Sequence, residues 1–131
     1  MNSRDLAWCA GLMDGEGTIG LYGRKFAVRV HMTDLRALRK IRGVLGGSIR
    51  KCKVPPNHKA AWEWSIVDRK SVARALGALL PFLTTKRQEA QAVLSFLRTR
   101  PTHRGVPYSP KEREAMVKLY WRLRNLKAGK R

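Results

Sequence analysis

Apolar positions along this chain recur with two periods, one typical of strands and one typical of helices. They alternate with polar residues in four short segments, at 18–22, 26–32, 48–53 and 61–67. This is the period of a strand with one buried face. They recur every three or four residues in longer segments that begin near residues 3, 35, 69, 86 and 110, as in a helix with one buried side. The predicted order is therefore helix–strand–strand–helix–strand–strand–helix, followed by one or two further helices.

Capping residues and prolines place the ends of these helices. The predicted N-caps are Ser3, Thr33 or Asp34, Asp68 and Ser109, because short polar side chains satisfy the first free N–H groups of a helix. Pro81 breaks the third helix. Residues 109–112 form a capping box with proline at the first helical position, and this box opens a last helix that runs to about Lys127.

These elements favour an α+β fold in which helices cover one side of an antiparallel sheet and leave the other side open. Strand parity then assigns the residues of each face. Ile19, Val28 and Trp64 are expected to point toward the helices. The residues expected on the open face are Tyr22, Arg29, His31, Arg50, Cys52 and Glu63, with Arg24 and Lys25 at the turn between the first two strands.

The charge balance indicates a polyanionic partner. The 131 residues include 28 Lys and Arg against 9 Asp and Glu, a formal net charge of +19. Solubility alone needs a net charge of only about 2–8 in a small domain. Nucleic acid is the partner that this excess favours, although charge alone leaves an acidic membrane surface open. The apolar content is sufficient for one compact domain.

Several other classes of protein are disfavoured. The longest apolar run, 75–83, contains Pro81 and is shorter than the roughly 20 residues of a bilayer-spanning helix. The first residues lack the pattern of a secretory signal. Cys9 and Cys52 form no Cys-x-x-Cys pair, so neither a disulfide scaffold nor a zinc module is indicated. We expect an intracellular, reducing compartment, such as a bacterial or phage-infected cytoplasm or an organelle matrix.

The open face offers the chemistry for reading double-stranded DNA. A twisted antiparallel ribbon can enter the major groove, where arginine binds guanine and a carboxylate accepts a hydrogen bond from cytosine. Arg29, Arg50 and Glu63 supply both kinds of group. The alternative interpretation is an ordinary solvated sheet face, and the pattern alone leaves both open.

Residues 9–17 read Cys-Ala-Gly-Leu-Met-Asp-Gly-Glu-Gly. This segment resembles the signature of the LAGLIDADG homing endonucleases. The matches are Ala10, Gly11, Leu12, Asp14 and Gly17, and Met13, Gly15 and Glu16 are conservative departures. The resemblance extends over residues 5 to about 98, through the element order, the pair Thr33-Asp34, and Pro81-Phe82-Leu83 followed by Lys86. It implies an αββαββα fold with a saddle-shaped sheet.

The resemblance implies a magnesium- or manganese-dependent endonuclease that cuts both strands of a long, near-palindromic DNA site and leaves short 3′ overhangs. Glu16 is then the metal ligand, helped by the carbonyl of Gly15. Glutamate in place of aspartate lengthens the side chain by one methylene. Asp14 is expected to shape the turn rather than to bind metal. Lys86 and Asp34 match further catalytic positions, although Lys86 suits a simple phosphate contact and Asp34 a helix cap equally well.

The first helix also carries a stripe of small residues. Ala7, Gly11 and Gly15 recur every four residues, which lets another helix backbone approach closely. The motif occurs once, so similarity to the single-motif members of the family implies a homodimer. In this dimer the stripe and Trp8 would pack against the same residues of the second copy. The alternative is that the glycines pack against the core of their own chain.

The last part of the chain lies outside the resemblance. We divide the sequence into an endonuclease core, 1–100, and a C-terminal loop and basic helix, 101–131, packed on or extending the same domain. This helix is interpreted as a clamp on flanking DNA, and truncation after Pro107 should then weaken binding and its salt dependence. The basic residues available to phosphates are Lys118, Arg122, Arg124, Lys127, Lys130 and Arg131.

The leading interpretation is an intron-encoded or otherwise mobile DNA endonuclease, with double-stranded DNA as partner and no membrane. A first alternative keeps the fold without cleavage, as an RNA-splicing maturase that binds intron RNA or as a DNA-binding regulator. A second is a basic structural RNA-binding protein, which gives no reason for a glycine stripe beside Glu16. Magnesium-dependent DNA cleavage separates the first interpretation from both alternatives.

Overall fold

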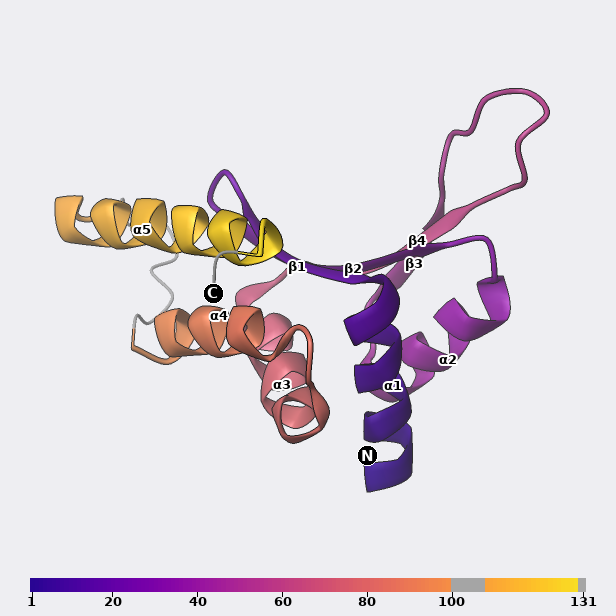
Figure 1. The fold of residues 1–131 in the computed structure, drawn as a ribbon, viewed down its shortest axis with the longest axis horizontal. Helices are drawn as coiled ribbons and strands as arrows, with labels where there is room; N and C mark the ends of the chain where they lie inside the picture. The colour runs from indigo at the N-terminus through magenta and orange to yellow at the C-terminus, as the bar shows by residue number, and fades with distance from the viewer. Residues whose placement is uncertain (100–107, 130–131) are drawn as a thin grey trace.

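The fold in the computed structural model is a four-stranded antiparallel sheet with helices α1 to α4 on one side (Figure 1). The structure describes residues 1–99 and 108–129. The elements are α1 (Ser3–Glu16), β1 (Gly17–Tyr22), β2 (Lys25–Met32), α2 (Leu35–Leu45), β3 (Ser48–Lys51), β4 (Trp62–Ile66), α3 (Arg69–Leu79), the 3₁₀ turn η1 (Leu80–Phe82), α4 (Arg87–Thr99) and α5 (Pro110–Lys127). The predicted α+β class and element order are confirmed.

The strands lie in the order β1-β2-β4-β3, so β1 and β3 form the edges. β1 and β2 form a hairpin in which Gly17 faces Val30, and β2 pairs with β4 so that Val30 faces Trp64. β3 pairs with β4 only between Ser48 and Lys51. Alternate residues of β1, β2 and β4, such as Ile19, Val28 and Trp64, are buried on the side of the helices, as the sequence pattern predicts.

The centre of the core is Trp64, whose side chain is fully buried. Its indole N–H donates to the carbonyl of Gly46 at 2.8 Å, which satisfies the one polar group of this buried ring. The next residue, Gly47, has φ +94°, and a Cβ there would lie 2.7 Å from the carbonyl oxygen of Ser65. The chain therefore requires glycine where α2 turns into β3.

The structure corrects several predicted boundaries. Asn2, not Ser3, caps α1, and its side chain accepts the N–H of Asp5 at 2.8 Å. The third strand ends at Lys51 rather than at residue 53, because pairing with β4 stops at Trp62. Around Pro81 the chain tightens into a 3₁₀ turn, and α4 begins one residue later than predicted, at Arg87.

The C-terminal helix α5 packs along the β1 edge and antiparallel to α4 (Figure 1). The predicted capping box at Ser109 is present. Met116, Leu119 and Leu123 join the same hydrophobic cluster as the rest of the chain. Truncation after Pro107 would therefore expose the core, and point variants are needed to test the clamp hypothesis. Lys130 and Arg131 lie outside the described residues.

Both cysteines are free thiols. Burial raises the pKa of the Cys9 thiol to about 11, with a further increase from Asp5 and an opposing effect of Lys40. Cys9 therefore remains an uncharged core residue on the inner side of α1. Among the described residues, no helix combines the length and the apolar character needed to cross a membrane.

Candidate active site and nucleic-acid interface

The open face of the sheet carries the residues that strand parity assigned to it. The register places His31 opposite Glu63 and Glu63 opposite Arg50, while Arg29 lies two residues before His31 on the same face. Tyr22 ends β1 on this face, Arg24 lies in the hairpin turn, and Lys25 opens β2. Cys52 follows β3 immediately and is half-buried. The structure shows these residues on or beside the open face, and their contacts with DNA stay a prediction.

Ion pairs hold two arginines on this face. The Glu63 carboxylate lies 3.8 Å from Nε of Arg29 and 3.4 Å from Nη2 of Arg50. The guanidinium of Arg29 also stacks over the Tyr22 ring, 4.2 Å from its centroid. The Tyr22 ring in turn folds back over Gly20. A Cβ at Gly20 would lie only 2.7 Å from the tyrosine hydroxyl, so this position leaves no room for a side chain. In the free protein Glu63 thus orients Arg29 and Arg50 rather than leaving its carboxylate free for a base.

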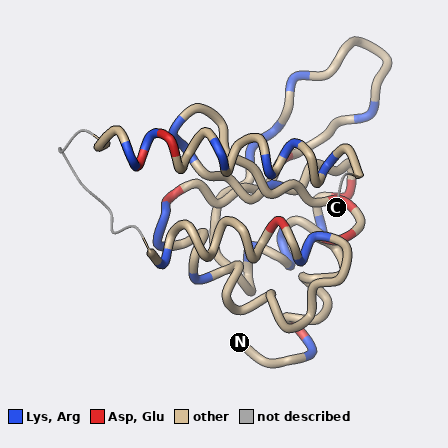
Figure 2. Tube along the Cα trace, turned by 60° about the vertical axis from the view of Figure 1, so that its left-hand side comes forward, with Lys and Arg blue, Asp and Glu red and all other residues tan. Residues whose placement is uncertain are grey.

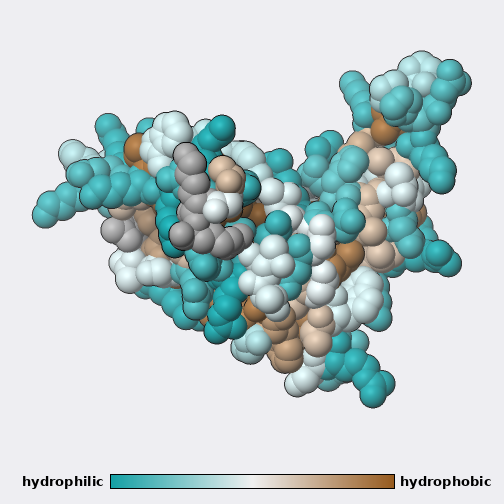
Figure 3. All heavy atoms as spheres, viewed as in Figure 1, coloured by the Kyte–Doolittle hydropathy of each residue, from teal (hydrophilic) through white to brown (hydrophobic). Residues whose placement is uncertain are grey.

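A long loop between β3 and β4 projects beyond the sheet and carries Lys53, His58 and Lys59 (Figure 1). Lysine and arginine residues occur along most of the chain (Figure 2). The surface is hollowed between α5 and this loop, and hydrophilic residues cover both ends of the hollow (Figure 3). Lys59 is a further basic residue here that the sequence pattern did not indicate. Pro55 and Pro56 marked the loop, but no periodic pattern indicates the direction in which a loop projects.

Asp14 connects the end of α1 to the start of α4. Its carboxylate accepts the backbone N–H groups of Thr84 and Lys86, each at 2.9 Å. These donors lie 70 and 72 residues away along the chain. Asp14 therefore shapes this junction, and it brings the half-buried Lys86 beside the C-terminal end of α1.

Glu16 is the last residue of α1, two positions beyond Asp14. Its side chain is exposed. No three His, Cys, Asp or Glu side chains come together as a metal site in the part of the chain that the structure describes. One chain thus offers the Glu16 carboxylate and the neighbouring Gly15 carbonyl. This set fits Mg²⁺, which is bound by one or two carboxylates with waters and substrate phosphates completing its shell.

Asp34 is the N-cap of α2. Its carboxylate accepts the N–H of Arg36 at 3.0 Å and lies 3.4 Å from Nε of the same residue. Desolvation is the largest single influence and raises the pKa of Asp34, but the N–H groups of Ala37 and Arg36, with the Arg36 charge, together hold it below its ordinary value. Capping explains the residue in this structure, and its catalytic role stays a prediction.

The small-residue stripe of α1 faces solvent. Ala7, Gly11 and Gly15 are exposed, while Cys9 and Met13 point into the core. A Cβ at Gly11 or at Gly15 would meet no atom within 4 Å. The alternative that these glycines pack against their own chain is therefore wrong. Trp8 lies half-buried at the side of the stripe, with Nζ of Lys40 4.4 Å from its ring centroid.

Comparison with known proteins gives one curated relative. The chain is 31% identical over 109 residues, 72% of its own length, to DNA endonuclease I-CvuI of Chlorella vulgaris. It spans 65% of the length of that relative. No family model matches the chain.

Solved structures share the fold. The homing endonuclease I-CvuI, in complex with the I-CreI target, aligns with a TM-score of 0.70 and 24% identity over 95% of this chain and 85% of that one. The archaeal intron-encoded homing endonuclease I-Vdi141I, in complex with DNA, aligns with a TM-score of 0.75 and 14% identity over 94% of this chain and 84% of that one.

Proposed function

We propose that this chain is a homing endonuclease of the LAGLIDADG type, a site-specific DNA endonuclease that makes a metal-dependent double-strand cut as a homodimer. The proposal is supported by its similarity to DNA endonuclease I-CvuI and by the fold it shares with solved homing endonucleases. The observation that carries the proposal is the end of α1, where an exposed Glu16 follows an open glycine stripe and Asp14 holds the backbone of Lys86 near this end. A basic open sheet face lies next to it. Together they would supply a metal ligand, a cation for the phosphate and a surface that binds the duplex.

The homodimer follows from the open face of α1. Exposed glycines in a helix interior cost about 1 kcal/mol each relative to alanine, and they are useful where another helix backbone packs closely. A two-fold axis along Ala7, Trp8, Gly11 and Gly15 would bring both copies of Glu16 together. The second copy supplies the carboxylate that a single chain lacks, so the cleavage site is complete only in the dimer.

The chemistry of the site follows from its donors. Glu16 and the Gly15 carbonyl would hold Mg²⁺ or Mn²⁺, an ion that polarises the phosphate and lowers the pKa of the attacking water. Asp14 holds the backbone of Lys86 just before α4, and the Lys86 ammonium group would offset negative charge on the phosphate. Asp34 at the start of α2 is the least supported member of the set, because it already caps its helix.

The open face would bind the DNA. Arg29 and Arg50, oriented by Glu63, are suited to guanine in the major groove. Tyr22, Arg24, Lys25, His31 and Cys52 would add backbone or base contacts around them. A dimer carries twice the net charge of +19, which favours binding to a long stretch of phosphates and predicts a steep salt dependence.

Scission of a duplex tests this function. A target is first selected from a pool of randomised duplexes by its affinity for the protein, and it is then incubated with the protein in Mg²⁺ or in EDTA. We expect double-strand cleavage in Mg²⁺ and intact, still bound DNA in EDTA, because the metal supplies the chemistry and the sheet supplies the affinity. Cleavage at equal rates in EDTA, or none in Mg²⁺ or Mn²⁺, would contradict the proposal.

A further inference from the structure

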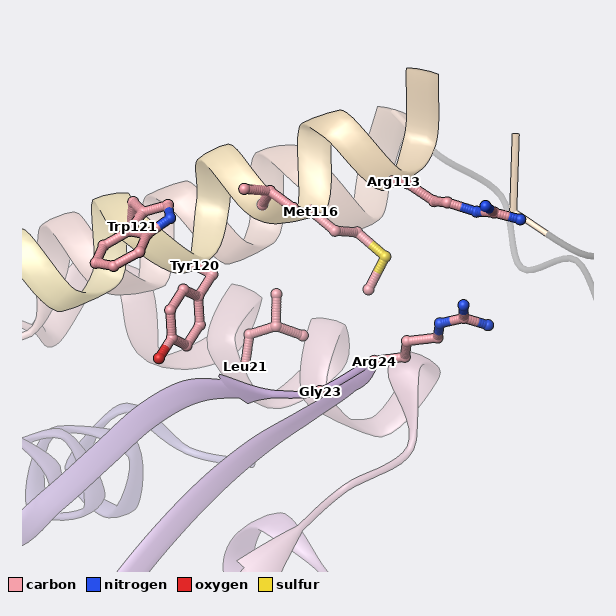
Figure 4. A pocket seen from close by; sticks show the side chains of 8 residues that line it. Leu21, Gly23, Arg24, Arg113, Met116, Tyr120 and Trp121 are labelled. Atoms are coloured by element: carbon pink, nitrogen blue, oxygen red, sulfur yellow. The ribbon is translucent and has the colours of Figure 1, made fainter. Parts of the chain in front are cut away.

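A groove runs between α5 and the hairpin of β1 and β2. It consists of two adjoining hollows of about 530 and 430 Å³, and Leu21 and Tyr120 line both of them. Figure 4 shows the larger hollow, where side chains of α5 point toward the hairpin turn at Gly23. Its size lies within the range of about 300–1,000 Å³ that is usual for ligand pockets.

The charged side chains that the structure describes along this groove are all positive. Arg24 and Arg113 line the first hollow, and Arg124 and Lys127 line the second. Within residues 1–99 and 108–129, no Asp or Glu lines either hollow. Arg24 and Arg113 reach toward the same end of the larger hollow, one from the hairpin and one from α5 (Figure 4). The groove therefore favours an anionic occupant.

The charges at the second end are crowded. Desolvation lowers the pKa of Lys127, and the nearby cations Lys86, Arg124 and Arg29 lower it further, against an opposing effect of Glu89. Nζ of Lys127 also lies 5.8 Å from the centroid of the Tyr22 ring. An anion bound there would relieve the repulsion among these cations.

Aromatic rings also line the groove and offer a surface for stacking. Trp121 is 56% exposed and meets Tyr120 edge-on, with 5.4 Å between ring centroids. Both residues line the larger hollow, where the Tyr120 ring points toward the hairpin (Figure 4). Trp121 falls outside the buried stripe of Met116, Leu119 and Leu123, so packing among the residues that the structure describes does not account for it. A large exposed indole beside arginines provides a stacking surface for flat rings.

We infer that this groove binds a single-stranded segment of nucleic acid, with a base stacked on Trp121 and phosphates on the four cations. Unpaired bases have free faces for stacking on aromatic side chains, whereas a duplex hides these faces within its own stack. A duplex bound in this groove would contact the four cations through its phosphates, but none of its bases would stack on Trp121. This activity goes beyond the proposed cleavage of duplex DNA and does not depend on it.

Fluorescence anisotropy with labelled oligo(dT), oligo(U) and a duplex of equal length tests the inference. We expect Trp121→Leu to weaken binding of at least one single strand about tenfold, because the stacked base is lost. Trp121→Phe should retain most of the affinity, and neither change should affect the duplex. The difference between oligo(dT) and oligo(U) shows which sugar the groove prefers.

Charge variants of α5 provide the matched control. Arg113→Gln and Lys111→Gln each remove one positive charge from α5, but Lys111 is exposed in the first turn of the helix and is not among the residues that line either hollow. Only Arg113→Gln should reduce the salt-dependence slope for single strands, by about 0.7 per phosphate contact. Failure of the wild type to bind single strands, no effect of Trp121→Leu, or an equal loss for the duplex would each overturn the inference. Duplex scission in Mg²⁺ reports separately on the proposed function.

Discussion

Replacement of Glu16 by glutamine is expected to abolish strand scission while leaving DNA binding almost unchanged. The amide keeps the size of the side chain but removes the negative charge that would hold a divalent cation. Glu16 is exposed at the end of α1, so the fold does not depend on its carboxylate. Loss of metal stabilisation of the transition state should lower the single-turnover rate about a thousandfold or more. The rate is measured in Mg²⁺ on a duplex selected for affinity to the wild type.

Glu114→Gln is the control for this change. Glu114 is also an exposed carboxylate, 3.6 Å from Lys118 on α5, and its loss should leave the rate within about twofold, since exposed ion pairs contribute little. A Glu16→Gln protein that cuts within a fewfold of the wild-type rate would exclude Glu16 from the mechanism.

Replacement of Gly11 by leucine is expected to separate the dimer and to abolish cleavage. Within one chain the new side chain has room, because a Cβ at position 11 meets nothing within 4 Å. The isolated chain should even gain about 1 kcal/mol of stability from the better helix former. Across a two-fold axis the same side chain would hold the two helices apart. Sedimentation velocity measures the oligomeric state, and urea unfolding measures the stability.

Gly43→Leu provides the matched control. Gly43 lies in α2, and a Cβ there also meets nothing within 4 Å. This variant should make the same gain in helix propensity and remain dimeric and active. If Gly11→Leu sediments as a dimer and cleaves like Gly43→Leu, the two-fold axis does not lie along this stripe.

Much of the fold could be predicted because its signals are local. Periods of two and of about 3.6 residues locate the strands and helices, and the capping box at Ser109 starts α5 where expected. The same alternation assigned Arg29, Arg50 and Glu63 to the open face before any register was known. Boundaries were less accurate, because strand ends depend on the pairing partner, as at Lys51 and Trp62.

The contacts that build the site are not local, and the sequence gives little indication of them. Asp14 accepts N–H groups from residues 70 and 72 positions away, and only the folded chain brings these donors to α1. The pairing of one carboxylate, Glu63, with both Arg29 and Arg50 is equally non-local. The groove of Trp121 was missed, although the position of this tryptophan outside the apolar stripe was a visible signal.

The central claim is that two copies of this chain cut DNA at a shared two-fold axis, each contributing one Glu16. The measurement that tests it most directly is the position of the cut ends on both strands of the selected duplex, read by sequencing after reaction in Mg²⁺. We expect one cut on each strand, placed symmetrically about the centre of a near-palindrome and leaving short 3′ overhangs. Cuts on one strand only, or scattered cuts without a common centre, would contradict it.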